Sequence, residues 1–279
     1  YANAHQRDAQ DAAIVQAALS GAASCLRRVD QPVLGWLDAW LGGQPAGQDK
    51  LRQLALRRCQ QLSSPVAAKA VEDTACYRYG RLLSRNEVGA DPGEFSMSAN
   101  AFHHAMQARA LTWPHAMLTT ATHDHKRGED VRARLAVLSE RPAQWLAAAH
   151  QWRTEHAAWI RHLPTGPAPS PAAQWMLYQT LVGIWPAGFD WHDADTVRDL
   201  AERVAQWQEK AQREAKLRTD WFAPDADYEA ASRDFVLTLL TGEAASTFLP
   251  SLAAFVQSVA PAAAINSLAQ TLLRTTLPG

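Results

Sequence analysis

The chain has 279 residues, of which 47% are hydrophobic, and this is enough apolar material for one large or two medium-sized domains. Its 27 Lys and Arg residues balance 28 Asp and Glu residues, so the net charge is −1 and the sequence predicts no nucleic-acid partner. No uninterrupted apolar run reaches the roughly 20 residues of a membrane span and no signal-peptide pattern occurs, so we expect no membrane partner and a cytoplasmic location.

Helices are predicted for the N-terminal part of the chain, because apolar side chains recur there at intervals of three and four. The spacing predicts one helix over residues 14–26, a second over 33–41 and a third over 51–62. Two later stretches lack this period and are rich in small apolar residues, namely Pro65–Val71 and Pro114–Ala121. Both are predicted to be buried strands.

The segment between the two predicted strands alternates helical and turn-rich patterns. Thr74–Arg85 is predicted to be helical, and the sequence "NEVGADPGE" that follows is typical of a loop. Ser98 stands where it can cap the next helix, which is expected to end near Leu111. The order from Pro65 onward is therefore strand, helix, strand.

The C-terminal half is predicted to be helical from Gly128 onward, with Pro142 opening the second helix. Leu163–Pro171, "LPTGPAPSP", is interpreted as a linker because of its proline and glycine content. A long helix is expected from Val197 to about residue 219. Three or four further helices are expected between the breaks at Pro224, Gly242, Pro250 and Pro261.

Trp residues recur every seven positions in one of these helices, at Trp145, Trp152 and Trp159. This spacing places the three rings on one helix face, which favours core packing and leaves a carbohydrate-binding platform as the alternative. The three cysteines, Cys25, Cys59 and Cys76, have no CxxC spacing and are odd in number. We therefore expect buried thiols rather than a disulfide framework or a zinc cluster.

Ionisable side chains gather where each predicted strand ends. The first group closes the predicted strand Pro65–Val71 and the second closes Pro114–Ala121; together they comprise Lys69, Glu72, Asp73, His123, Asp124, Lys126 and Arg127. In a (β/α)8 barrel, strand ends of this kind carry the functional groups. Charged residues at strand ends are also common as helix caps, so either group alone is weak evidence for a site.

Three segments carry a resemblance to a known family. "PVAAKAVEDTACYRYGRLLSRNEVGADP", "WPHAMLTTATHDHKRGEDVRARLAVLSE" and "REAKLRTDWFAPDADYE" resemble signature segments of the maltooligosyl trehalose synthases, which belong to the α-amylase superfamily. The family pattern differs at four positions of these segments: it favours Gly where Ala70 and Ala90 stand, Phe where Cys76 stands and Thr where His125 stands. None of the four differences removes an ionisable group of the motif.

The resemblance implies an enzyme that converts the reducing-end α-1,4 linkage of a maltooligosaccharide into an α,α-1,1 linkage by retaining intramolecular transglycosylation, without a cofactor or a metal. Asp124 matches the third catalytic carboxylate of the superfamily, and His123 matches the adjacent sugar-binding histidine. The other residues expected to bind the substrate are Lys69, Glu72, Asp73, Tyr77, Lys126 and Arg127. No segment of the chain resembles those that carry the nucleophile and the acid/base, so the chain is expected to be an inactive internal fragment.

The predicted fold is predominantly α: a helical, bundle-like insertion attached to a few β-strands of an incomplete (β/α)8 barrel. Residues 1–62 are expected to be a helical segment before the sixth barrel strand, 63–127 to hold the sixth and seventh strand units, and 128–279 to be a helical insertion that leads to the eighth strand. Since two barrel strands cannot bury both faces alone, helices or another molecule must cover them.

Three other functions remain open at this point. The first is a glucan hydrolase of the same superfamily, and the second is a non-enzymatic helical interaction module, which the Ala-rich composition favours. The third is a metal site, suggested by the histidines His103, His104, His115, His123 and His125. Retaining glycosyl transfer requires no metal, so this reading is the weakest of the three.

Overall fold

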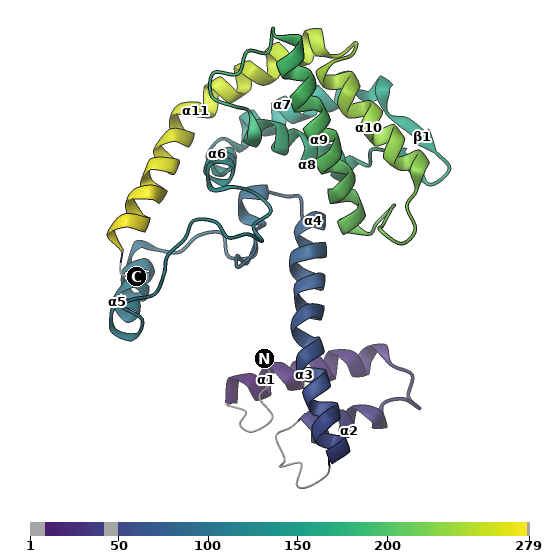
Figure 1. Ribbon diagram of the computed structural model, residues 1–279, viewed down its shortest axis with the longest axis vertical. Helices are drawn as coiled ribbons and strands as arrows, with labels where there is room; N and C mark the ends of the chain where they lie inside the picture. Colours follow the sequence, from purple (N-terminus) through teal and green to yellow (C-terminus); the bar gives the residue numbers. More distant parts are fainter. Residues whose placement is uncertain (1–8, 42–49, 278–279) are drawn as a thin grey trace. The chain divides into compact units, whose positions relative to one another are not determined.

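The computed structural model describes residues 9–41 and 50–277, which form two compact units that meet at Val71 and Glu72. The first unit contains three helices, coloured purple to blue in Figure 1: α1 (Ala9–Cys25), α2 (Pro32–Leu41) and α3 (Lys50–Ala70). This confirms the three helices expected from the apolar spacing. The Gln16 side chain donates a hydrogen bond of 2.9 Å to Asp38 and thereby links α1 to α2.

Neither of the two predicted strands is present. The first, Pro65–Val71, is helical, because α3 continues through Pro65 to Ala70. The second, Pro114–Ala121, consists of turns and loop. Backbone groups of a barrel strand are satisfied only by neighbouring strands, and the described part of the chain supplies none beside these segments. A short run of small apolar residues is also compatible with a helix, so the pattern alone was ambiguous.

The second unit begins with short helical turns instead of the single helix predicted over Thr74–Arg85. They are a π-helical turn (Val71–Ala75), α4 (Cys76–Arg78) and a 3-10 turn (Leu83–Arg85). The Asn86 amide donates hydrogen bonds of 2.6 Å to the carbonyl oxygens of Cys76 and Tyr79, and these bonds stabilise the chain as it leaves α4.

The loop and the capped helix that follow were predicted correctly. Glu87 to Ser98 contains turns and no regular element, and α5 runs from Ala99 to Thr112. The hydroxyl of Ser98 accepts a hydrogen bond of 3.2 Å from the backbone N–H of Ala101, as expected for an N-cap.

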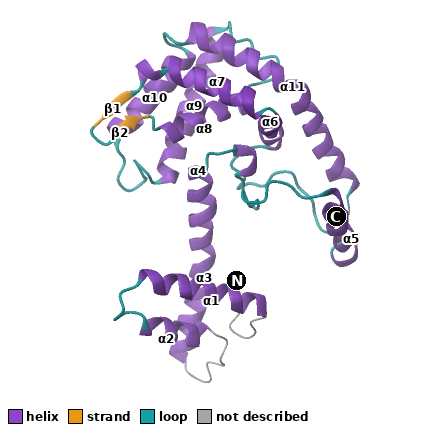
Figure 2. Ribbon diagram, turned by 180° about the vertical axis from the view of Figure 1, so that it is seen from behind, coloured by secondary structure: helices purple, strands orange, loops and turns teal. Residues whose placement is uncertain are grey.

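Six longer helices build the rest of the second unit (Figure 2), which confirms a predominantly α protein. They are α6 (Glu129–Glu140), α7 (Pro142–Glu155), α8 (Pro171–Ile184), α9 (Ala194–Ala215), α10 (Ala226–Leu240) and α11 (Ala245–Thr276). The helix predicted to end near residue 219 thus ends at Ala215, where Lys216 adopts a left-handed conformation with φ of 52°.

The segment interpreted as a linker forms a small hairpin. Strand β1 (Arg161–Leu163) pairs antiparallel with β2 (Gly166–Ala168), and these are the only strands in the described residues. Ala168 is fully buried beside Tyr228 of α10, and the two belong to a small apolar cluster. Proline and glycine here shape a turn that packs on the helices, so composition alone misidentified its role.

One continuous apolar core joins the helices of the second unit. Trp145 and Trp152 are buried in it, and Trp159 packs against it, which confirms core packing for the Trp stripe. The ring of Trp152 meets the rings of Tyr178 and Phe248 at centroid distances of 5.6 and 5.5 Å. Aromatic contacts of this geometry stabilise a core beyond the area that they bury.

Helix α11 is longer than the sequence pattern predicted, because it passes through both Pro250 and Pro261. By length and composition it could also cross a membrane, contrary to the expectation from apolar runs, and 44% of its most apolar window is buried in the structure. Phe248 and Leu252 of its first half are fully buried in the core. This burial offsets the backbone hydrogen bonds that proline removes.

The cysteines differ from the prediction that all three are buried. Cys76 is buried beside the core of the second unit, whereas Cys25 and Cys59 are exposed. The two exposed thiols lie on α1 and α3, in the unit whose described helices leave many apolar side chains exposed, Trp36 among them. A cysteine on such helices is buried only if another element covers it.

Candidate functional site

The π-helical turn places the first group of predicted site residues, Glu72 and Asp73. The turn is held by the C-terminal end of α9: the Lys216 ammonium donates hydrogen bonds to the Asp73 carbonyl at 3.2 Å and to the Thr74 hydroxyl at 2.8 Å. The guanidinium of Arg78 in turn donates to the Ala215 carbonyl at 2.6 Å. π-Helical turns are rare and often occur at functional sites, because the inserted residue redirects its neighbours.

A buried carboxylate holds the second group. The two Glu87 oxygens accept hydrogen bonds from the backbone N–H groups of Lys126 and Arg127, both at 2.8 Å. The same carboxylate accepts from the N–H of Val88 at 2.8 Å. Glu87 is thus the anchor that brings the loop of Asp124 to the end of α4.

Lys126 lies at the centre of the site. Its ammonium nitrogen is 2.8 Å from a carboxylate oxygen of Asp124 and 3.1 Å from one of Asp73. The Lys126 side chain is only 7% exposed, and its nitrogen lies 6.0 Å from the centre of the Tyr77 ring. A charge-assisted pair with so little solvent access is held more rigidly than a surface ion pair.

Glu72 completes the cluster through a hydrogen bond to Asp124, and this bond is the largest cause that raises the pKa of Glu72 above its ordinary value. The pKa of Asp124 is lowered, first by its hydrogen bond to Lys126 and then by that to Glu72. Burial acts to lower the pKa of Lys126, but the hydrogen bonds to Asp124 and Asp73 outweigh it and raise that pKa. Asp124 is therefore the more acidic of the two carboxyl groups.

This arrangement suits the stabilisation of positive charge and not a complete glycosyl-transfer site. The carboxyl groups of Asp73 and Asp124 outnumber the single ammonium of Lys126 that they share, and an excess of negative charge favours a cationic transition state. A retaining glycosidase, however, holds its two carboxyl groups about 5 Å apart across the scissile bond. Glu72 and Asp124 interact directly enough to shift each other's pKa, which is not the arrangement of two carboxyl groups with a scissile bond between them.

The remaining predicted residues lie in different surroundings. His123 is exposed next to Asp124 in the chain. Arg127 is buried, donates a hydrogen bond of 3.2 Å to the Asn86 carbonyl, and has a pKa lowered by that burial. Tyr77 is buried as well, which raises the pKa of its hydroxyl. Lys69 lies in the last turn of α3, in the first unit, so the cluster described above contains residues of the second unit alone.

Sequence reasoning missed Glu87 and Lys216, the two side chains that position the cluster. Glu87 lies in a segment whose composition indicated only a loop, and Lys216 follows a helix whose end was predicted about four residues later, near residue 219. The third family-like segment contains Lys216, and it also contains the paired side chains Arg213 and Glu229, at 2.8 and 2.6 Å. The density of charge in that segment was the one signal that pointed to a structural role.

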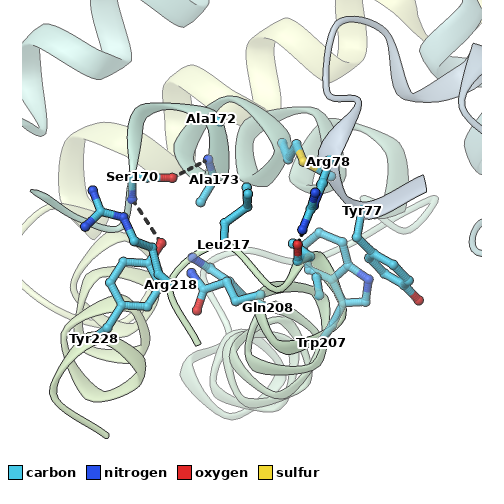
Figure 3. A pocket seen from close by; sticks show the side chains of 14 residues that line it. Tyr77, Arg78, Ser170, Ala172, Ala173, Trp207, Gln208, Leu217, Arg218 and Tyr228 are labelled. Carbon is cyan, nitrogen blue, oxygen red and sulfur yellow. Dashed lines mark hydrogen bonds between the residues drawn. The ribbon is translucent and has the colours of Figure 1, made fainter. Parts of the chain in front are cut away.

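Two pockets lie near the cluster in the second unit. One, of about 540 Å³ with its solvent-open space, is lined by side chains of α4, α8, α9 and α10 (Figure 3). The other, of about 730 Å³ on the same measure, is lined in part by Lys126, Arg127 and Arg203. Trp207 contributes to both. Over residues 9–41 and 50–277, no three His, Cys, Asp or Glu side chains gather as metal ligands.

Comparison with known proteins identifies relatives of the chain. No model of a known protein family matches it. It is 39% identical over 239 residues to a provisionally named maltooligosyl trehalose synthase of Mycobacterium tuberculosis, found in strains CDC 1551 / Oshkosh and ATCC 25618 / H37Rv; the aligned part is 85% of this chain and 27% of that protein. The chain therefore spans about a quarter of the length of the curated relatives that it matches.

Solved structures show the same likeness. The maltooligosyltrehalose synthase from Arthrobacter ramosus aligns with 95% of this chain and 31% of its own, with a TM-score of 0.75 and 32% identity. A hypothetical maltooligosyl trehalose synthase of Sulfolobus tokodaii aligns with 83% of this chain and 30% of its own, with a TM-score of 0.69 and 30% identity. The chain is therefore homologous, in sequence and in fold, to part of the maltooligosyl trehalose synthases.

Proposed function

We propose that this chain is part of an enzyme that converts the reducing-end α-1,4 linkage of a maltooligosaccharide into an α,α-1,1 linkage, by a retaining intramolecular transfer. The observation that supports this most is the contact of Asp124 with Lys126, which also binds Asp73, so that two of the family-like segments meet there. The names of the relatives agree with this reaction, although the chain covers only 27% of the curated ones.

Asp124 is the group that we assign to the reacting sugar. A fixed carboxylate beside the ring stabilises the transition state more than the substrate, because positive charge on the ring grows as the bond breaks. Lys126 is a positioning residue in this proposal, since its ammonium is already shared by Asp124 and Asp73. His123 is exposed and adjacent, so it is the residue of the pair best placed to contact a sugar hydroxyl.

The nucleophile and the acid/base come from outside this chain. Glu72 and Asp124 each shift the pKa of the other, so we do not assign these two as the retaining pair. Tyr77 and Arg127 support the cluster from buried positions, and Asp73 orients Lys126. The purified chain is expected to form no trehalose-capped product from maltopentaose, because covalent and acid/base catalysis are both missing.

The fold proposal extends to the missing strands. Pro65–Val71 and Pro114–Ala121 would be the sixth and seventh strands of a (β/α)8 barrel once the rest of the barrel is present, with 1–62 before them and 128–279 as the helical insertion. The physical basis is that strand hydrogen bonds need neighbours. Hydrogen exchange on the complete protein tests this: protection of alternate backbone amides in both segments supports it, and a helical protection pattern in Pro65–Val71 contradicts it.

The experiment that tests the function is Asp124→Asn in the complete enzyme. The amide keeps the shape and loses the charge, so turnover should fall by roughly a hundredfold or more, with a much smaller change in KM. Products from maltopentaose are separated by chromatography, and Asp234→Asn, at an exposed position on α10, is the control that should leave turnover unchanged.

Other outcomes separate the competing functions. If the unmodified enzyme releases free glucose and no trehalose-capped product, the hydrolase reading replaces the mutase. If Asp124→Asn leaves turnover as it was, the cluster is not catalytic and the interaction-module reading gains support. A change in KM alone would make Asp124 a binding residue whose contribution is equal in the substrate and the transition state.

A further inference from the structure

The loop that carries Asp124 contains a tight turn that takes no part in the mechanism above. The backbone N–H of His125 donates a hydrogen bond of 3.3 Å to the carbonyl oxygen of Thr122, which closes a turn of four residues. Within the turn, the Thr122 hydroxyl accepts a hydrogen bond of 3.4 Å from the backbone N–H of Asp124. The backbone of Asp124 is thus held inside the turn, between the two residues that close it.

The imidazole of His125 closes the same turn through its side chain. Its Nδ1 lies 3.0 Å from the backbone nitrogen of Thr122, which donates to it, and 2.7 Å from the Thr122 hydroxyl oxygen. Among the described residues, Thr122 is the only hydrogen-bond partner of this ring. The two residues are therefore joined by their backbones and, independently, by this imidazole.

The bond from the backbone decides the protonation state of the ring. A backbone N–H can only donate, so the Nδ1 that faces Thr122 must be an acceptor and carries no proton. A neutral imidazole has one protonated nitrogen, which here is Nε2. A proton added to Nδ1 would place two donors 3.0 Å apart, and the Thr122 N–H would lose its acceptor. The closed turn therefore requires His125 to be neutral.

The charged groups nearby offer this ring no ion pair. On the loop itself the ionisable neighbours are His123, Asp124, Lys126 and Arg127. Charged side chains on the segments that contact the loop are Glu72, Asp73, Glu87, Glu129 and Arg132. Asp124 and Asp73 pair with Lys126, and none of these groups pairs with His125 in the part of the chain that the structure describes. A second proton on the ring would break the bond from Thr122 without gaining an ion pair.

We propose that His125 is a positioning residue: its neutral imidazole closes the turn that presents Asp124 to Lys126, and protonation of the ring opens this turn. The requirement for a neutral ring follows from the contacts of Nδ1. The consequence for turnover rests on the proposed function, because it assumes that Asp124 acts on the reacting sugar. In acid the loop keeps the bonds from its backbone to Glu87 and loses the side-chain closure next to Asp124.

Two amide substitutions separate the acceptor from the titratable ring. The side-chain oxygen of asparagine can occupy the place of Nδ1, so His125→Asn keeps an acceptor for Thr122 that gains no proton. The amide of glutamine lies one bond further out, near the place of Nε2, so His125→Gln removes the acceptor from the turn. Both variants are uncharged amides, which makes them a matched pair.

The first measurement is nitrogen-15 NMR on the 279-residue chain between about pH 5 and about pH 8. At the upper end, the His125 ring should carry its proton on Nε2. Hydrogen-exchange protection of the Thr122 amide, relative to an unstructured chain at the same pH, should fall by about fivefold or more towards the lower end, which is the loss of one hydrogen bond. His125→Asn should keep this protection at both ends, and His125→Gln should lack it at both.

The second measurement is turnover of the complete enzyme over the same pH range. His125→Gln should lower turnover by about fivefold or more at neutral pH with little change in KM, because a displaced Asp124 stabilises the transition state less. His125→Asn should keep turnover at neutral pH and should lose less of it in acid than the unmodified enzyme does. His115→Asn, at an exposed position, is the control and should leave the pH profile unchanged.

The contrary outcomes are distinct. A proton on Nδ1 at neutral pH, or equal protection of Thr122 in His125→Asn and His125→Gln, overturns the proposal whatever the enzyme does. The expected NMR result together with unchanged turnover in His125→Gln overturns the positioning role. Failure of the proposed function is seen separately, as unchanged turnover in Asp124→Asn, and it does not alter the NMR result because that measurement involves no catalysis.

Discussion

At the scale of single residues, the candidate site depends on which carboxyl group is ionised. Lys126 is the main cause of the lowered pKa of Asp124, and its hydrogen bond to Asp124 measures 2.8 Å. Glu72 and Asp73 are neighbours in the chain and both are acidic. Glu72 interacts with Asp124 whereas Asp73 pairs with Lys126, so the two have different roles in the cluster. Exchanging Lys126 for a neutral residue is therefore the most direct test of the electrostatic arrangement.

Lys126→Met should raise the pKa of Asp124, because the hydrogen bond from Lys126, which is the largest cause of its lowering, and the opposite charge are both lost. The carboxylate would then be ionised only at higher pH than in the unmodified chain. Carbon-13 NMR titration of the Asp124 carboxyl carbon measures the change directly. Lys210→Met, at an exposed position on α9, is the matched control and should leave the titration where it was. An unaltered pKa in Lys126→Met would mean that Lys126 does not hold Asp124 in solution.

At the scale of elements, one arginine completes the end of a helix. The guanidinium of Arg134 on α6 donates to the carbonyl oxygens of Val182, Gly183 and Trp185, which are the last carbonyls of α8 and its continuation. These carbonyls have no partner within the helix, and burial lowers the pKa of Arg134 itself. The contact also fixes α6 against α8, where Gly183 approaches Val131 and Leu135 closely.

Arg134→Met should lower the free energy of unfolding by about 2 kcal/mol, because hydrogen bonds from a charged donor to buried carbonyls are lost. Urea denaturation followed by circular dichroism measures the difference. Arg153→Met on α7 is the control, since Arg153 is exposed, and it should change stability by less than about 0.5 kcal/mol. Equal losses in the two variants would contradict the capping role of Arg134.

Local sequence patterns identified most helices but not the long-range contacts that they make. Local sequence pattern located α1 to α3 by apolar spacing, the start of α5 by its capping serine, and the Trp stripe of α7 and the turn that follows it. It failed where distant contacts decide: Pro250 and Pro261 lie inside α11, and the proline-rich segment at residues 163–171 folds as a hairpin. For the site, the motif identified the ionisable groups, but the anchors Glu87 and Lys216 act through contacts that no local pattern encodes.

At the scale of the whole molecule, the core of the second unit contains a histidine that is kept neutral. His156 is 1% exposed, its Nδ1 lies 2.9 Å from the Tyr178 hydroxyl oxygen, and the rings of Phe248 and Phe235 flank it. Burial lowers its pKa from 6.5 to about 4. The folded state therefore excludes a proton that the unfolded chain accepts.

Stability should consequently fall as the pH drops. The unfolded chain gains a proton at His156 below about pH 6.5 and the folded state gains it only below about pH 4, so the loss builds up between these values and reaches about 3 kcal/mol. Urea denaturation at a series of pH values measures it. His156→Leu should be less stable at neutral pH, where Tyr178 loses its partner, and should show a correspondingly weaker dependence on pH. Parallel pH profiles for the two proteins would contradict the assignment.

The Glu87 carboxylate has a consequence for how this region can vary. Its oxygens accept hydrogen bonds from the backbone N–H groups of Val88, Lys126 and Arg127. The last two residues lie 39 and 40 positions after Glu87. The long segment between Val88 and Lys126, which includes α5, thus has both of its ends fixed by one side chain, whatever path the segment takes. Lengthening a surface loop adds little to the entropy of closing it. Homologous chains can therefore gain, lose or exchange residues in this segment while the positions of Asp124 and Lys126 relative to each other stay the same.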